Sequence, residues 1–122
     1  MKKTCLVLLI AFATLKVSAQ TTIEAKDAAK HIGEEVTICD KVFGGKFLNI
    51  PGLTLLDLGG GSHPNELLSL VINSDNRKKF TTPPEDKFKG QQVCVTGKLV
   101  DYRGKPEIMI TDTAQIKIDY RK

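Results

Sequence analysis

A glycine-rich segment in the middle of the chain contains the residues whose types come nearest to a catalytic loop. Residues 59–63 read GGGSH and lie between two leucine-rich runs. A phosphate-binding loop of the G-x-x-x-x-G-K-[ST] type needs a lysine for the phosphate, and no lysine follows here. The G-x-S-x-G pattern of a serine nucleophile is also absent around Ser62. Because glycine permits positive φ angles, the segment is predicted to be a turn between two strands, with His63 facing solvent.

The acidic, histidine and cysteine side chains show no pattern of a catalytic or metal site. Four aspartates fall at predicted turns and strand ends: Asp57, Asp75, Asp101 and Asp112. Nothing in their spacing indicates that two of them converge, and Asp112 is predicted to be a turn or cap residue. His31 and His63 do not show the ligand spacing of a zinc site with Cys39 or Cys94. We therefore predict no catalytic residue, no metal and no cofactor, and we expect that the protein is not an enzyme.

The N-terminal residues are typical of a signal peptide. A basic start, an apolar run over residues 6–15 and small residues at the −3 and −1 positions fit cleavage after Ala19. A membrane span needs about 20 apolar residues, and Lys16 interrupts this run too early. We predict that residues 1–19 are a signal peptide and that the protein is exported to the periplasm or secreted. Residues 20–122 then form a single domain without a transmembrane segment.

The overall charge gives little support to a nucleic-acid function once this segment is removed. The full chain has 18 basic and 14 acidic residues, for a net charge of +4. Three of the lysines and none of the acids lie in residues 1–19, so 15 basic and 14 acidic residues remain. A nucleic-acid site would therefore have to depend on local basic patches.

Hydrophobic periodicity and turn residues predict a chain made mostly of short strands. The predicted order is a helix (22–33, with Thr22 as a cap and Gly33 as its end), a strand (34–43), a break (44–52), two strands (53–59 and 66–74), a helical turn (74–80, capped by Ser74 or Asp75), a loop (81–90), a strand (91–102), a turn (103–105) and a last strand (106–118). The loop is predicted because two consecutive prolines, Pro83 and Pro84, oppose regular structure. Five short, mostly antiparallel strands with a small helix after the third favour an all-β, closed Greek-key barrel.

Three stretches of the sequence resemble a known family. They are HIGEEVTICDKV, LLDLGGGSHPNELLSLVINSDNRKKF and KGQQVCVTGKLVDYRGKPEIMITDTAQI. These stretches are similar to small exported bacterial OB-fold proteins, which are related to tRNA-anticodon-type nucleic-acid-binding OB domains. The resemblance covers about residues 22–118 and implies a five-stranded OB barrel with an N-terminal helix and a short helix between strands three and four. Asp40 stands where such domains usually have a glycine that bends the first strand.

The resemblance also implies that Cys39 and Cys94 lie side by side on the outer surface. Strands one and four of an OB barrel are antiparallel neighbours, and each cysteine alternates with apolar residues along its strand. A disulfide between them would add about 2–4 kcal/mol of stability. The alternative is two unpaired cysteines, because cross-strand pairs often miss disulfide geometry.

The same resemblance implies a ligand-binding surface on strands two and three and on two loops. Single-stranded nucleic acid needs aromatic rings for base stacking and cations for phosphates. The six residues of these types in the two loops are Phe43, Lys46 and Phe47 in the first and Tyr102, Arg103 and Lys105 in the second. A further cationic cluster, residues 77–79, lies on the short helix. In the alternative interpretation, Phe43 and Phe47 pack into the core and the lysines are ordinary solvated charges.

The function that the resemblance implies is weak, sequence-tolerant binding of single-stranded nucleic acid. The alternative function is a periplasmic or surface module that binds an envelope protein or a glycan through the same barrel face. That alternative would be favoured if the leucines of the second and third strands formed an exposed apolar patch.

Overall fold

A computed structural model of the chain describes residues 21–59 and 68–121. The predicted signal peptide (residues 1–19) lies outside the described residues, and so do Ser62 and His63 of the glycine-rich segment. Within the described ranges, no helix is long and apolar enough to cross a membrane.

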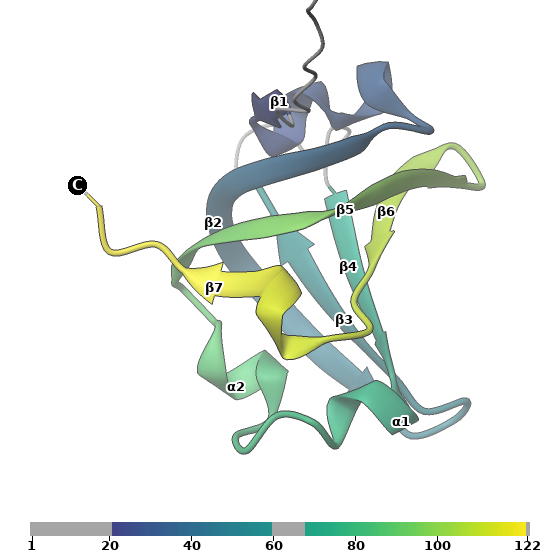
Figure 1. The fold of residues 1–122 in the computed structure, drawn as a ribbon. Helices are drawn as coiled ribbons and strands as arrows, with labels where there is room; N and C mark the ends of the chain where they lie inside the picture. Colours follow the sequence, from purple (N-terminus) through teal and green to yellow (C-terminus); the bar gives the residue numbers. More distant parts are fainter. Residues whose placement is uncertain (1–20, 60–67, 122) are drawn as a thin grey trace, which may run out of the picture.

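The protein is built mostly of β-strands, as predicted, with short helices between them (Figure 1). The elements in chain order are β1 (Thr21–Ile23), η1 (Ala25–His31), β2 (Glu35–Leu48), β3 (Leu53–Leu58), β4 (Leu68–Asn73), α1 (Ser74–Arg77), α2 (Pro84–Lys87), β5 (Gln92–Tyr102), β6 (Lys105–Met109), η3 (Thr113–Gln115) and β7 (Ile116–Ile118). Those labelled η are 3₁₀ helices.

The strands pair in the order β1-β2-β3-β4-β6-β5-β7, and β2 also pairs with β5. The pairings β2–β3–β4–β6–β5 therefore lead back to β2. The pairs β1–β2 and β4–β6 are parallel and the others are antiparallel. The prediction of five strands was wrong by two, because β1 and β7 are three-residue strands at the margins of the sheet.

Strand β2 is long enough to serve two neighbours. Its first half pairs with β5, and its second half pairs with β3. The register shifts between Val42 and Gly44, so the ladder is interrupted at Phe43 and not at Asp40, which stays opposite Val93. The prediction that the strand breaks at residues 44–52 was wrong for residues 44–48, because two glycines let β2 continue past the shift.

The core lies between the inward faces of these strands, and the predicted alternation is confirmed. The inward residues of β2 and β5 are completely buried: Val36, Ile38, Val42, Val93, Val95 and Leu99. Leu56 and Leu58 of β3 are also completely buried, and so are Leu68 and Leu70 of β4. The leucine-rich runs of these two strands therefore supply the core and not an exposed patch.

The N-terminal helix begins later than predicted. Thr22 does not cap it, because this residue pairs with Thr37 in the strand ladder, and Glu24 occupies the N-cap position. The backbone N–H of Ala25 instead donates to Oδ2 of Asp40 at 3.2 Å. The carboxylate that replaces the expected glycine therefore satisfies an otherwise unpaired donor at the start of η1.

Two other boundaries differ from the predictions because of capping chemistry. Helix α1 is capped by the Asn73 side chain, which accepts from the Asn76 N–H at 2.9 Å, and not by Ser74 or Asp75. The Pro83–Pro84 pair does not exclude a helix, because Pro84 is at the first helical position of α2, where a missing N–H costs nothing.

The predicted last strand is divided in two. Asp112 caps η3 in a capping box with Gln115, and the chain then returns as β7. The prediction that Asp112 is a cap residue is confirmed. The strand prediction was wrong between Met109 and Ile116, because the capping box stabilises a helical turn within the run of isoleucines.

Adjacent glycines in β2 give a matched test of this arrangement. A Cβ at Gly45 would lie 2.7 Å from Leu56 Cδ2 and 3.0 Å from the Leu55 carbonyl oxygen, whereas a Cβ at Gly44 would meet nothing within 4 Å. We expect Gly45→Ala to lower the free energy of unfolding by about 1–3 kcal/mol through overpacking. The control Gly44→Ala should change it by less than about 0.5 kcal/mol. Urea unfolding of both variants checks this, and equal midpoints would contradict it.

Candidate nucleic-acid interface

The second group of predicted ligand residues lies on the β5–β6 hairpin. Tyr102 and Lys105 are paired at its end, and Arg103 and Gly104 form a two-residue turn with φ angles of 52° and 87°. Positive φ at both turn positions matches the right-handed twist of the flanking strands. Tyr102 is 51% exposed, and the Arg103 guanidinium lies 5.2 Å from the centroid of its ring.

The first predicted group lies on strand β2 and not in a loop. Phe43 is 49% exposed, and the Lys41 ammonium lies 5.4 Å from its ring centroid. Phe47 is 36% exposed, and the Arg77 guanidinium lies 4.1 Å from its ring centroid. Neither phenylalanine belongs to the core, so the interpretation that placed both of them there was wrong.

The two groups are not brought together at one end of the molecule. The turn after β2 lies beside α1, since a Cβ on Gly52 would be 3.5 Å from Ser74 Cβ. The β5–β6 hairpin lies at the opposite end of the structure from α1 and α2 (Figure 1). Along β6, Lys105 is separated by four residues, or about 13 Å, from Met109. The surface of β2, β3, β4 and β6 extends between the groups.

That outer surface carries both signs of charge and an apolar row. The strand registers align Lys46, Leu55, Val71 and Met109 in one row. A neighbouring row follows from the pairings β2–β3, β3–β4, β4–β6 and β5–β6. It consists of Gly44, Asp57, Ser69, Glu107 and Val100. Burial raises the pKa of the Glu107 carboxyl, and the charge of Lys105 opposes that shift. The acids reduce the attraction of this surface for phosphate.

Arg77 links the first group to the helices. Its Nε donates a hydrogen bond to Oγ1 of Thr54 at 3.0 Å. Its Nη2 donates a hydrogen bond to the carboxylate of Glu85 on α2, and the two side chains form an ion pair. Thr54 is completely buried on β3, so this contact satisfies a hydroxyl within the sheet. The sequence indicated Arg77 as part of a cationic cluster, but no signal identified Thr54 or Glu85 as its partners.

Hollows in the surface lie next to Arg77 and extend beyond it. One of about 360 Å³ adjoins Phe47 and Arg77, and another of about 510 Å³ lies between α2 and β7. Three residues that no motif singled out line the second hollow: Lys87, Lys117 and Tyr120. They are dispersed in the sequence and meet only because β7 returns beside β5. A hydrophobic pattern could not have found them.

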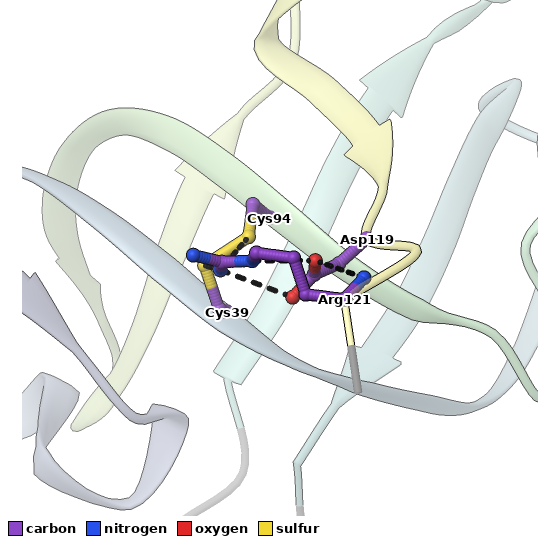
Figure 2. Close-up of polar contacts among 4 residues, drawn as sticks. All are labelled: Cys39, Cys94, Asp119 and Arg121. Atoms are coloured by element: carbon purple, nitrogen blue, oxygen red, sulfur yellow. Dashed lines mark hydrogen bonds and ion pairs between the residues drawn. A yellow bond between two sulfur atoms is a disulfide. The ribbon is translucent and has the colours of Figure 1, made fainter.

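Cys39 and Cys94 are joined by a disulfide on the outer face of the β2–β5 pair (Figure 2). Arg121 lies across it, with Nη2 3.7 Å from Cys39 Sγ and 3.6 Å from Cys94 Sγ. The Arg121 side chain also donates to both Asp119 oxygens, and these hydrogen bonds hold the pKa of the Asp119 carboxyl below its usual range. Asp119 and the two sulfurs are close enough to share a cation, but a bonded cysteine offers no thiolate ligand.

Comparisons with known proteins identify the fold but no family. No family model matches the chain, and no curated protein matches it. The structure is similar to part of a putative aspartyl-tRNA synthetase from Leishmania major Friedlin, with a TM-score of 0.53 and 10% identity over 90% of this chain and 23% of that one. It is also similar to the aspartyl-tRNA synthetase from Entamoeba histolytica, with a TM-score of 0.54 and 12% identity over 92% of this chain and 27% of that one.

A third similar structure is smaller. OBody AM1L10, bound to hen egg-white lysozyme, has a TM-score of 0.57 and 14% identity over 87% of this chain and 100% of that one. The chain thus spans about a quarter of the length of the synthetases that it resembles. At these identities the likeness is one of fold, and the fold is of the OB type.

The disulfide generates a stability prediction. The cross-link closes a loop between residues 55 positions apart, which restricts the unfolded chain. We expect Cys39→Ser with Cys94→Ser to lower the free energy of unfolding by about 2–4 kcal/mol. Urea unfolding with and without a reducing agent checks this. The reductant should destabilise the wild type by a similar amount and leave the double variant unchanged, and a wild type insensitive to reduction would contradict the prediction.

Proposed function

We propose that the protein is a non-catalytic OB-type module that binds single-stranded nucleic acid weakly and with little sequence preference. The OB-type fold and the sequence resemblance to tRNA-anticodon-type domains support this function. The circuit of pairings through β2, β3, β4, β6 and β5 supports a closed Greek-key barrel. The signal-like residues 1–19 support export to the periplasm or beyond.

The observation that carries the proposal is the pairing of rings with cations. Each aromatic residue of the predicted groups, namely Phe43, Phe47 and Tyr102, is at least 36% exposed and has a Lys or Arg group within 5.4 Å of its ring centroid. A base can stack on an exposed ring while the adjacent cation attracts the phosphate. Because stacking is possible for every base, this arrangement predicts sequence tolerance.

The alternative of an envelope-protein or glycan module gains no support from the structure. An exposed patch of leucines on the strands now labelled β3 and β4 would have favoured it. Leu56, Leu58, Leu68 and Leu70 are completely buried. In the outward row, Val71 is buried and Met109 is exposed, and this row lies beside Asp57 and Glu107.

Salt dependence tests the proposed function. We expect fluorescence anisotropy to detect binding of a labelled single-stranded oligonucleotide at low salt, with an affinity that falls linearly on logarithmic axes as salt rises. Tyr102→Leu should weaken binding by about 1–3 kcal/mol because a stacking ring is lost. Lys26→Gln, at an exposed position on η1, serves as the control. A wild type that shows no binding even at low salt would refute the function.

A further inference from the structure

Three surface hollows between α1 and the residues that follow β7 are neighbours, because each shares lining residues with the next. The hollow beside Phe47 shares Phe80 and Thr81 with the 510 Å³ hollow between α2 and β7. That one shares Ile118 and Tyr120 with a third hollow of about 730 Å³, which reaches Arg121. We call this feature the basic groove. Helices α1 and α2, beside which the first two hollows lie, are at the end of the structure opposite the β5–β6 hairpin (Figure 1).

The net charge of the basic groove is positive. The cations among its lining residues are Arg77, Lys78, Lys79, Lys87, Lys117 and Arg121. Three of these cations have their charge compensated: Arg77 by Glu85, Lys78 by Asp75 and Arg121 by Asp119, the one acid among the described lining residues. Among the described residues, the net positive charge of the groove therefore comes from Lys79, Lys87 and Lys117. Lys79 is held in place, since its Nζ donates to the Thr111 carbonyl oxygen at 2.8 Å. Low-dielectric walls around clustered positive charges favour an extended anion.

Aromatic rings occur at intervals along the same groove. Tyr120 is 82% exposed and borders both the second and the third hollow. Phe80, which packs edge-on against Phe88 at 6.0 Å between centroids, borders the first and second. Phe47 with its stacked Arg77 stands at the far end. Cations alternating with rings along a groove form the arrangement that tracks a single strand.

We propose that the basic groove is a nucleic-acid site that takes the phosphodiester backbone of a single strand, with Tyr120 as a stacking platform for a base. The inference rests on the proposed function and adds the helix and β7 end as a second contact region for the strand, beside the rings of Phe43, Phe47 and Tyr102. The sheet face has Asp57 and Glu107 beside its cations, whereas the hollow between α2 and β7 has three lysines and no acid in its described lining. A duplex keeps its bases stacked internally, so it offers no base to Tyr120.

A matched pair of double variants tests the groove. In Lys87→Gln/Lys117→Gln two charges are lost from the groove. In the control Lys26→Gln/Lys30→Gln two charges are lost from η1, which lies beside β1 and away from α1 and α2 (Figure 1). Binding of a labelled single-stranded oligonucleotide is measured from low to high salt. We expect the groove variant to bind about tenfold more weakly at low salt, with a salt slope smaller by about 1.4. The control should keep the wild-type slope.

Two further measurements separate base stacking on Tyr120 from the attraction between the lysines and the phosphates. Tyr120→Leu should weaken binding without changing the salt slope, because the phenol carries no charge. A duplex of the same sequence should bind more weakly than the single strand. Urea midpoints equal to that of the wild type show that the variants are folded.

Failures of the two proposals are distinguishable. A wild type that does not bind at low salt would overturn the proposed function and the groove together. Equal losses in the groove and control variants would overturn the groove while the function stands. Duplex binding as tight as single-strand binding, or a Tyr120→Leu variant that binds like the wild type, would overturn the stacking role of Tyr120.

Discussion

The architecture depends on one constraint: strand β2 must pair with β5 along its first half and with β3 along its second half. A regular strand cannot turn from one neighbour to the other without a local break in its ladder. The chain meets this constraint at Phe43, where the register shifts and two glycines follow. Gly45 then allows β2 to approach Leu56 more closely than any side chain would permit. The pairings from β3 through β4, β6 and β5 return to β2 because of this bend.

The same bend determines which aromatic rings face outward. Phe43 lies at the register shift, has no partner in the β2–β3 ladder and is about half exposed. Phe47, four residues later, meets Arg77 from α1, and Arg77 is fixed in turn by Thr54 and Glu85. The cation over Phe47 is therefore positioned by the sheet, by α2 and by the ring itself. A binding surface at this end requires no adjustable loop to place its first ring and charge.

Much of the fold could be predicted from alternation, and the errors share a physical origin. Val36, Ile38, Val93 and Val95 alternate with polar residues, and this period alone located β2 and β5. Gly44–Gly45 was read as a break because glycine has two uses, ending a strand or bending one, and sequence does not separate them. Pro83–Pro84 was read as a loop although proline at the first turn of a helix is compatible with helix formation.

The candidate site was harder to predict, because it depends on long-range contacts. Tyr102 and Arg103 could be recognised, since a two-residue turn between alternating strands brings its own neighbours together. The groove between α2 and β7 could not, because Lys87 and Lys117 are 30 positions apart in the sequence and β7 was not foreseen as a separate strand. Asp112 caps η3, and β7, which carries Lys117, begins directly after this helix.

The position of the disulfide has a consequence for the unfolded chain. Cys39 and Cys94 are direct partners in the β2–β5 ladder, which is the pairing that brings the ends of the circuit together. When the oxidised chain unfolds, the disulfide still holds Cys39 next to Cys94, so the two partner positions of the β2–β5 register cannot separate. In an oxidised chain, the cysteines of β2 and β5 therefore stay together even when the strands are unfolded, and these two strands are the pair farthest apart in the sequence. The segment between the two cysteines is then a closed loop, which has fewer conformations than an open chain of the same length.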